Sequence, residues 1–399
     1  MSLPDFPPLR LRKNEHRRLR QGHLWVFSNE VDNKATPLRE FSAGDAVKVL
    51  DSRGQVLGTG YVNPNSLICA RLVSKDRNYP FTDSLFVHRL KVALSLRQRL
   101  YPEPFYRLVY GESDGLPGLV IDRFGDVFVV QINTAGMELK KEAIVAALNK
   151  LFKPQAIQWR NDSPIRELEG LPLYVETAQG ELPDSVEILE HGARFLVPML
   201  KGQKTGWFYD QHDNRGGLSR YVKGARVLDL FSYVGGWGIQ AVRAGAESAL
   251  CVDESASAID YVNKNAALNG LSAQVSAFKG EAFKTMSAMQ EAGEKFDVIV
   301  VDPPAFVKRK KAMKKGQEAY GRINQQAMKL LNRDGFLISC SCSYHMPRAS
   351  LIQQLNRGAT FLGRNLQIVA QGGQSADHPV HPAIPETEYL KAIYSRVTR

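Results

Sequence analysis

The sequence predicts a mixed α/β protein whose C-terminal half forms a mainly parallel sheet. From about residue 186, short apolar runs alternate with helical stretches, and this alternation is typical of a parallel sheet with helices on both faces. The length of 399 residues indicates two or three domains at roughly 150 residues each. We expect domains at 1–75, 76–185 and 186–399.

The composition is that of a globular protein. Hydrophobic residues make up 44% of the chain and charged residues 23%, which excludes a disordered or fibrous chain. No apolar run approaches the roughly 20 residues that cross a bilayer, and the first residues lack the apolar stretch of a secretory signal. We therefore expect no membrane association and a cytoplasmic location.

Cysteine spacing and net charge give the first indications about partners. The four cysteines form no paired zinc-ligand pattern and no disulfide framework, so we expect reduced thiols and no metal site. Lys and Arg number 52 against 41 Asp and Glu, a net charge of +11. This surplus fits a polyanionic partner such as nucleic acid, although a basic protein without such a partner fits it too.

Residues 1–75 read as a small β-rich module with a basic N-terminal stretch. Alternating runs at 45–62 and 67–73 are separated by turn residues, which predicts strands. Basic and aromatic side chains that would grip phosphates and stack on bases are Arg12, Arg17, Arg18 and Trp25. The alternative is that the aromatic residue belongs to the core and the arginines form a solvated face.

Residues 76–185 read as a small α+β unit. The pattern predicts a helix at 88–100, two strands around a Gly-rich turn within 115–133, a helix at 137–152 and a strand at 155–162. Pro164, Pro172 and Pro183 then predict a loop-rich link to the last domain.

In the last domain, predicted strands lie at 226–231, 249–253, 274–278, 296–302 and 335–342. Ligands of such sheets bind at the carboxyl ends of the strands, near the point where strand order reverses.

The loop after the first of these strands predicts a close approach to a ligand. Gly235 lies in the run Ser-Tyr-Val-Gly-Gly-Trp-Gly, where glycines permit a tight turn, and no Lys-Ser or Lys-Thr follows to cradle a triphosphate. Asp253 follows the second strand and can accept both hydroxyls of a ribose, while Glu281 follows the third. Asp253 can also be only a helix cap, and Glu281 only a solvated loop acid. Together they favour a nucleoside cofactor without a pyrophosphate.

A second constellation follows the fourth and fifth strands. Asp302 precedes two prolines that fix an extended exit from the strand, so that it can hold the polar edge of a base on which Phe306 stacks. The alternative is an ordinary turn. Cys340 and Cys342 share one face of the next strand, and one of them is a candidate nucleophile; the alternative is that both are small core residues.

A run of cations follows Phe306 directly. It includes Lys308, Arg309, Lys310 and Lys311, and its position beside the candidate site favours contact with substrate phosphates over a solvated face.

Several segments together resemble a known family. They are DLFSYVGGWG at 229–238, KTGWFYDQ at 204–211, the Asp302-Pro-Pro-x-Phe motif and DHPVHPAIPETEYLK at 377–391. They are similar to the bacterial class I S-adenosylmethionine-dependent methyltransferases of large-subunit ribosomal RNA, cytosine-5 type. The resemblance covers essentially the whole chain. It implies an N-terminal PUA domain for RNA, a small central α+β domain and a Rossmann-like methyltransferase domain, with S-adenosylmethionine as cofactor and 23S ribosomal RNA as partner.

The resemblance also implies roles for individual residues. Residues that would help to enclose the cofactor are Lys204, Thr205, Gly206, Phe208 and Asp210. Its methionine part would be lined by Asp229, Phe231 and Gly235. Asp253 would hold its ribose, and Glu281 would lie beside its adenine. Asp302 would face both the methyl donor and the base, and Cys342 would be the nucleophile.

One departure is Ala305, where the family often carries Lys; Lys308 is a possible replacement. Related enzymes that methylate a guanine nitrogen lack the cysteine, so Cys342 distinguishes cytosine-5 chemistry from methylation of another base atom. A third alternative is an RNA-binding or assembly protein without catalysis.

Overall fold

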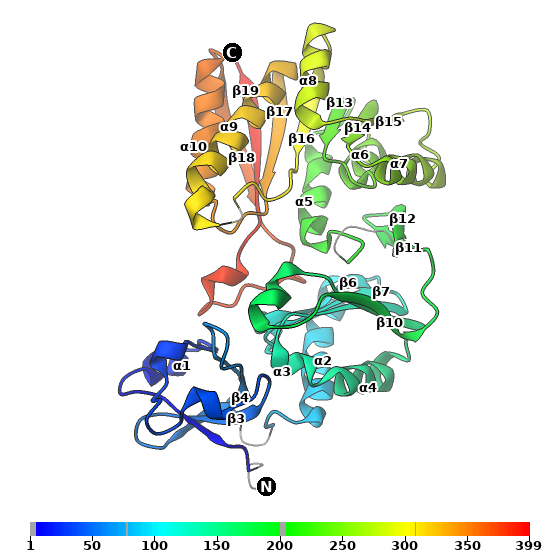
Figure 1. Ribbon diagram of the computed structural model, residues 1–399. Coiled ribbons are helices and arrows are strands. Elements are labelled where there is room, and N and C mark those ends of the chain that lie inside the picture. Colours follow the sequence, from blue (N-terminus) through cyan, green and yellow to red (C-terminus); the bar gives the residue numbers. More distant parts are fainter. Residues whose placement is uncertain (1–4, 77–78, 200–204, 308) are drawn as a thin grey trace. The chain divides into compact units, whose positions relative to one another are not determined.

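The computed structural model describes residues 5–76, 79–199, 205–307 and 309–399. The chain forms two compact units (Figure 1). The first unit comprises Met1–Asp184, Met199–Trp207 and Asp377–Thr387, and the second comprises Ser185–Pro198, Phe208–Ala376 and Glu388–Arg399. The domain boundaries expected after residues 75 and 185 remain a prediction.

The N-terminal part of the first unit is a five-stranded sheet, as the alternating runs predicted. Its strands in spatial order are β1 (Pro8–Arg10), β3 (Ala46–Leu50), β4 (Val56–Val62), β5 (Ala70–Ser74) and β2 (Trp25–Val26). A buried cluster that includes Leu9, Val47 and Leu72 fills its core. The basic stretch of the sequence leads into the short helix α1 (His16–Arg20).

The rest of the first unit is a second five-stranded sheet with helices. The sheet has the order β10 (Tyr174–Gly180), β9 (Ala156–Asn161), β8 (Val127–Ile132), β7 (Leu119–Phe124) and β6 (Phe105–Tyr110). The main helices are α2 (Asp83–Leu100) and α4 (Lys141–Phe152), with the short α3 (Ala135–Glu138) and the 3-10 turns η3 (Gly111–Asp114) and η4 (Pro164–Glu169).

The predicted loop-rich link was wrong over β10. This strand pairs antiparallel with β9 from Tyr174↔Asn161 to Gly180↔Ala156. Most of its side chains are exposed or half-buried, because it lies at the edge of the sheet. An edge strand carries polar residues and so lacks the apolar alternation that a sequence pattern detects.

The second unit is built on a seven-stranded sheet. Its order is β15 (Val275–Lys279), β14 (Ser248–Asp253), β13 (Arg226–Leu230), β16 (Phe296–Val301), β17 (Leu331–Ser341), β19 (Lys391–Thr398) and β18 (Asn365–Gly372). The first five strands run parallel, whereas β19 and β18 are antiparallel additions. The mainly parallel sheet is thereby confirmed.

Helices cover both faces of this sheet (Figure 1). A buried core cluster joins the sheet to α8 (Ala282–Glu291), α9 (Met313–Leu330) and α10 (Arg348–Phe361). On the other side α6 (Gly236–Arg243) and α7 (Ala256–Leu268) pack against β13, β14 and β15. A hairpin of β11 (Ser185–Glu190) and β12 (Ala193–Pro198) and the helix α5 (His212–Gly217) complete the unit. Among the described residues, no helix is long and apolar enough to cross a membrane.

Candidate functional site

The candidate site lies at the carboxyl edge of the seven-stranded sheet, where the strand order reverses. β13 pairs with β14 on one side and with β16 on the other, and ligands of open α/β sheets bind beside such a point. Asp229 is in β13, Asp253 ends β14 and Asp302 follows β16. The charges of Asp253 and Asp302 both act on Asp229, so the structure brings these three predicted carboxylates together.

The loop after β13 has a constrained backbone. Phe231, Tyr233 and Gly235 have φ angles of 64°, 50° and 88°, and a positive φ costs a side-chain-bearing residue about 1–2 kcal/mol. The end of β14 holds the loop in place: the Ser232 amide donates to the Val252 carbonyl at 3.0 Å and the Tyr233 amide to Asp253 Oδ2 at 3.0 Å. Strain that the surroundings maintain in this way is typical of ligand-binding loops.

Asp253 and Glu281 each bind backbone amides. Asp253 accepts from Tyr233 at Oδ2 and from the Ser255 amide at Oδ1, 2.9 Å away, and each oxygen can accept a second donor. The cap of α7 is Ser255 rather than Asp253. Glu281 caps α8 through the amides of Phe283 and Lys284, at 3.0 and 2.9 Å. The reading of Glu281 as only a solvated loop acid is therefore wrong.

Asp229 is fully buried, with one hydrogen-bonded oxygen. Its Oδ2 accepts from the Gly238 amide at 3.0 Å, and its Oδ1 has no hydrogen-bond partner within the described parts of the chain. Burial raises the pKa of this carboxyl to about 7, although the Gly238 amide lowers it. A buried acceptor of this kind fits a ligand that brings a cationic donor such as an amino group.

The segment before α5 supplies two further predicted residues. The ring of Phe208 meets the ring of Tyr233 edge to face at 5.5 Å, so it adjoins the strained loop. Asp210 is buried and accepts a 2.5 Å hydrogen bond from the Tyr389 hydroxyl. Thr205 and Gly206 belong to the first unit, and Lys204 lies outside the described residues.

Two residues that the sequence analysis missed fix Asp302. Its Oδ2 accepts from Gln211 Nε2 at 2.9 Å and from Trp237 Nε1 at 3.1 Å. Gln211 is itself held by Asn214, whose Nδ2 donates to Gln211 Oε1 at 2.6 Å. Gln211 and Trp237 lie within the two motifs that carry the resemblance, and that position was the available signal. The network immobilises the carboxylate that follows β16.

Cys342 lies between two serines that are tied to the helical layer. The hydroxyl of Tyr320, in α9, accepts from Ser341 Oγ at 2.9 Å and lies 3.1 Å from Ser343 Oγ. Cys342 Sγ lies on the side of the Asp302 loop, 4.0 Å from the carbonyl oxygen of Pro303. Cys342 is half-buried, whereas Cys340 is buried. The two serines are therefore tied to Tyr320, whereas the Cys342 thiol lies toward the Asp302 loop.

Lys391 is a buried cation beside this cysteine that the sequence did not single out. It opens β19 opposite Ser341, and its Nζ donates to the carbonyl oxygens of Ser343 at 2.7 Å and Tyr389 at 3.0 Å. Burial lowers its pKa to about 8, while the negative charge of a Cys342 thiolate raises it. The ammonium group in turn stabilises that thiolate.

The predicted phosphate contacts fall in both units. In the second unit Arg309 and Lys311 are exposed, Lys308 lies outside the described residues, and Lys310 is part of a 3-10 turn. In the first unit Arg12 and Arg17 are exposed.

Arg18 and Trp25 take part in contacts inside the first unit. Arg18 Nη2 donates to both carboxylate oxygens of Glu30, at 2.8 and 2.9 Å, and Trp25 Nε1 donates to Glu112 Oε1 at 2.9 Å. These contacts favour the structural alternative for Trp25 and leave Arg12 and Arg17 better placed to meet a partner.

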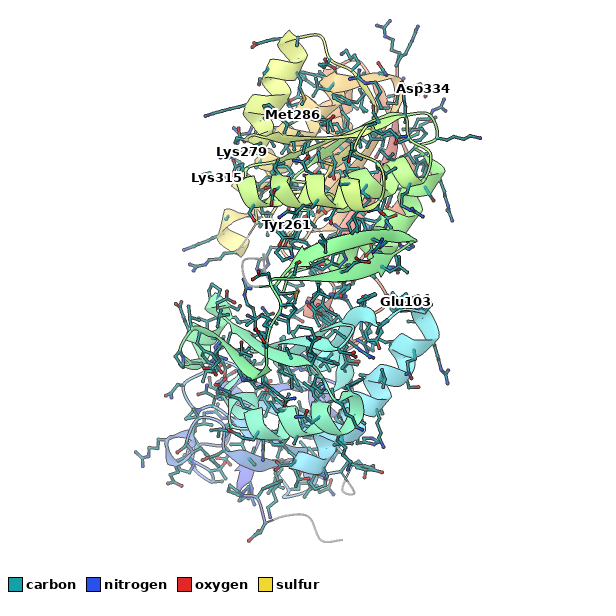
Figure 2. The ribbon with its side chains drawn as sticks, turned by 90° about the vertical axis from the view of Figure 1, so that its right-hand side faces the viewer. Glu103, Tyr261, Lys279, Met286, Lys315 and Asp334 are labelled. Atoms are coloured by element: carbon teal, nitrogen blue, oxygen red, sulfur yellow. The ribbon has the colours of Figure 1, made fainter. Side chains whose placement is uncertain are left out.

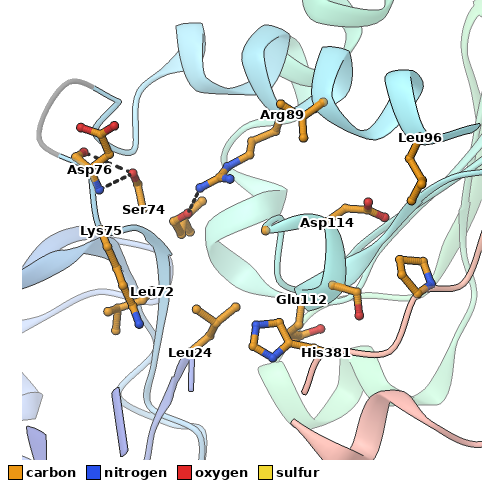
Figure 3. Close-up of a pocket in the computed structure, with 15 residues that line it drawn as sticks. Leu24, Leu72, Ser74, Lys75, Asp76, Arg89, Leu96, Glu112, Asp114 and His381 are labelled. Carbon is orange, nitrogen blue, oxygen red and sulfur yellow. Dashed lines mark hydrogen bonds between the residues drawn. The ribbon is translucent and has the colours of Figure 1, made fainter. Parts of the chain in front are cut away.

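Near Glu112 the first unit has a cavity of about 580 Å³ (Figure 3). Lys75, Arg89 and His381 line it together with Asp114. Arg89 Nη2 donates to the Val73 carbonyl at 3.1 Å, and burial lowers the pKa of Lys75 and of His381. The lining mixes both signs of charge and defines no single class of ligand. In the described residues no group of three His, Cys, Asp or Glu side chains is arranged to hold a metal ion.

Comparisons with known proteins agree with this architecture. The sequence matches the PUA-like domain family over residues 9–75 and the S-adenosylmethionine-dependent methyltransferase family over residues 159–386. The ribosomal RNA large subunit methyltransferase I of Klebsiella pneumoniae (strain 342) is 40% identical over 397 residues, covering 98% of each chain. The enzyme of the same name from Salmonella arizonae is 38% identical over 405 residues, covering 99% of each.

Solved structures show the same fold across the whole chain. A methyltransferase crystallised with SAH superposes with a TM-score of 0.82 at 20% identity, over 98% of this chain and 100% of the other. A SAM-dependent methyltransferase from Streptococcus mutans gives 0.80 at 20% identity, with the same coverage. The predicted Rossmann-like fold with an N-terminal PUA-like domain is confirmed, as is S-adenosylmethionine as the cofactor. The chain belongs to the S-adenosylmethionine-dependent methyltransferase family.

Proposed function

We propose that this protein methylates carbon 5 of a cytosine in large-subunit ribosomal RNA, with Cys342 as the nucleophile. The observation that carries the proposal is the half-buried Cys342 thiol, which faces the Asp302 loop at 4.0 Å from the Pro303 carbonyl between two anchored serines. The names of the 38–40% identical relatives support ribosomal RNA as the substrate.

We propose that side chains at the carboxyl edge of the sheet hold the cofactor. When bound, S-adenosylmethionine supplies an electrophilic methyl group. We assign Asp229, with its unpaired buried oxygen, to the amino group of the methionine part, and Asp253 to the ribose hydroxyls. Phe231, Gly235, Phe208 and Asp210 would line this side of the crevice, and Glu281 the adenine side. Thr205, Gly206 and Lys204 are further proposed contacts.

Carbon 5 of cytosine is a weak nucleophile, so the base needs activation. The Cys342 thiolate would add to carbon 6 and move electron density to carbon 5, which would take the methyl group and release S-adenosylhomocysteine. Transfer of the carbon 5 proton to solvent water and expulsion of the thiolate, with the double bond between carbons 5 and 6 formed again, would restore the aromatic ring and the enzyme. Asp302, held by Gln211 and Trp237, is positioned to accept from the exocyclic amino group of the base.

RNA contacts outside the base are proposed for exposed cations in each unit. Arg12 and Arg17 would contact RNA from the PUA-like part, with Arg18 and Trp25 supporting that surface. Arg309 and Lys311, with their neighbours Lys308 and Lys310, would contact the strand near the reacting base.

The test is methyl transfer from labelled S-adenosylmethionine to protein-free 23S ribosomal RNA that lacks the modification, followed by nucleoside mass spectrometry. We expect label in 5-methylcytidine, and we expect Cys342→Ala to reduce turnover by a factor on the order of 10³ or more. Cys340→Ala is the matched control: Cys340 is a buried thiol two positions away, so its removal should affect stability and leave product formation in place.

Cofactor affinity of Cys342→Ala, measured by calorimetry, establishes that the variant is folded. Label in a different nucleoside, or turnover that does not depend on Cys342, would indicate methylation of another base atom. RNA binding without methyl transfer would indicate a non-catalytic RNA-binding protein.

A further inference from the structure

A groove lined with positive charge runs along α9 and α10 on the surface of the second unit. We call it the α9–α10 groove. Its exposed cations are Lys311, Lys314, Lys315, Arg322, Lys329 and Arg357. Lys315 is labelled in Figure 2. Glu318 is the one acidic residue among the groove's lining residues.

The sequence places these cations on one side of α9 by helical spacing. Lys315, Arg322 and Lys329 recur every seven residues, which is two turns of an α-helix, so their side chains share a face. Arg357 comes from α10 and lines the same groove. The cations therefore form one row along α9, with a single cation added from α10.

Glycines form the floor where the two helices approach each other. A Cβ atom at Gly321 would lie 2.8 Å from Gln354 Oε1, and one at Gly358 would lie 3.5 Å from Gln325 Cβ. The helices therefore approach each other through backbone and amide groups, and the exposed ring of Phe361 also lines the groove. The charged groups of the lining are the six cations and Glu318.

The six cations form no ion pair in the part of the chain that the structure describes. No carboxylate lies within 4.0 Å of any of them there, whereas other surface cations, such as Arg194 with Glu187 at 2.6 Å, are paired. Six exposed cations with Glu318 as the one carboxylate in the lining repel one another and attract polyanions. The groove thus differs from the ordinary charged surface of this protein.

The groove begins at the site already described. α9 begins shortly after the Asp302 loop, beyond a 3-10 turn at Lys310–Ala312, and a Cβ at Gly316, the fourth residue of α9, would lie 3.1 Å from the Phe306 carbonyl oxygen. The amide of Val307 donates to Ser343 Oγ at 3.1 Å. The start of α9 is therefore packed against the loops that carry Asp302 and Cys342, and the rest of the helix leads away from them.

We propose that the α9–α10 groove binds the phosphate backbone of the RNA substrate beyond the nucleotide that reacts. This inference rests on the proposed function, since it takes RNA as the substrate, and adds a second RNA-contact surface to it. A row of cations along α9 with Arg357 from α10 beside it matches the charge of a phosphate backbone. Backbone contacts of this kind position the RNA and carry no base specificity.

The test is a triple variant, Arg322→Ala/Lys329→Ala/Arg357→Ala, which removes three cations far along the groove from Cys342. The matched control is Arg220→Ala/Lys223→Ala/Arg243→Ala, which removes three exposed cations outside the groove. Binding of full-length enzyme to unmodified 23S ribosomal RNA is measured by filter binding at several salt concentrations. Methyl transfer is measured at increasing RNA concentration.

We expect the groove variant to bind RNA about tenfold more weakly, or more weakly still, at moderate salt. The steepness of log K plotted against the logarithm of the salt concentration should fall by about 2 to 3, because each lost phosphate contact removes about 0.7–0.9 from that slope. The weaker binding should appear as a higher KM for RNA, while kcat and the affinity for S-adenosylmethionine stay unchanged. The control variant should retain the wild-type slope.

Equal losses in both triple variants would overturn the groove as a site, since the effect would then be one of net charge. An unchanged affinity and slope in the groove variant, while the wild type methylates RNA, would overturn the groove and leave the proposed function intact. A wild-type protein that neither binds nor methylates ribosomal RNA would overturn the proposed function itself.

Discussion

Cys340, in β17, and Cys342, just after its end, show how surroundings give identical side chains different chemistry. Burial raises the pKa of the Cys340 thiol well above its usual range, so this residue stays protonated and behaves as a small apolar group. Cys342 is half-buried and lies near the ammonium group of Lys391. Alternation in the sequence predicted that both thiols share one face. Their different burial, and a cation from β19 about 50 residues later, give the two thiols different reactivity, and no local sequence pattern reveals either difference.

Asp229 predicts a pH dependence of stability. Its pKa of about 7 in the folded protein lies above the usual value of 3.8, so the folded state holds this proton more tightly than the unfolded state. The resulting stabilisation is fully present below about pH 4 and is lost as the pH rises through 7, in total about 4 kcal/mol. We expect Asp229→Asn, which can still accept from the Gly238 amide, to remove this component from urea-unfolding free energies measured between pH 4 and 8.

The same residue couples cofactor binding to proton release. If the carboxylate form of Asp229 binds the amino group of the cofactor, the affinity for S-adenosylmethionine should increase as the pH is raised toward 7, by up to about tenfold per pH unit. Above pH 7 the affinity should no longer change with pH. Calorimetry at pH 6 and 8 in buffers of different ionisation enthalpy measures both the affinity and the proton released. Asp229→Asn should bind more weakly and without that proton. Proton release that persists in the variant would assign it to another group.

At the scale of elements, the strands next to the candidate site were the best predicted part of the fold. β13 and β16 are short runs rich in Val, Leu and Ile and are largely buried, which gives them a strong local signal, and the shorter apolar run of β14 is partly buried. The polar edge strand β10 and the antiparallel pair β18 and β19 have no comparable run next to a turn motif. Lys391 opens β19, and the sequence around it therefore gave no indication of its place beside Cys342.

The site was predictable where one motif supplies both the residue and its position, as with Asp253, Asp302 and Cys342. It was not predictable where the partner comes from a distant segment. Gln211 and Trp237 meet Asp302 from elements 91 and 65 residues away, and only the folded sheet brings them to one carboxylate.

The loop between β13 and α6 gives a prediction for that element. Gly235 has a φ of +88°, and a Cβ there would lie 3.1 Å from Ile239 Cδ1. Gly293→Ala is the control, because Gly293 has a φ of +74° with nothing within 4 Å of the added atom. Each change should cost about 1–2 kcal/mol in unfolding free energy from backbone strain alone.

Only Gly235→Ala should also weaken S-adenosylmethionine binding, by about tenfold or more, because it displaces a loop that approaches the ligand. Equilibrium dialysis with labelled cofactor distinguishes the two variants. Equal affinities for both would show that the loop does not contact the cofactor.

For the whole molecule, the two compact units have separate sources of stability. In the first unit a buried network connects the PUA-like sheet to η4: Glu169 accepts from Arg71 Nη1 at 2.9 Å and from Asn63 Nδ2 at 2.9 Å. Both charged side chains are at most one-tenth exposed. Truncating one partner of a buried pair leaves the other charge unpaired in a low-dielectric interior.

We therefore expect Glu169→Ala to destabilise the first unit by about 3–5 kcal/mol. Glu187→Ala, which removes an exposed pair with Arg194 in the second unit, should cost at most about 1 kcal/mol.

S-adenosylhomocysteine should stabilise the second unit by mass action, because the proposed carboxylates Asp229 and Asp253 lie there. Hydrogen exchange followed by mass spectrometry reports on both units in one experiment. Glu169→Ala should speed exchange in peptides from β7 and β8, and the ligand should slow exchange in peptides from β13 and β14. If each perturbation instead changed protection equally in both sets of peptides, the chain would unfold as a single cooperative unit, and the division into two stability units would be wrong.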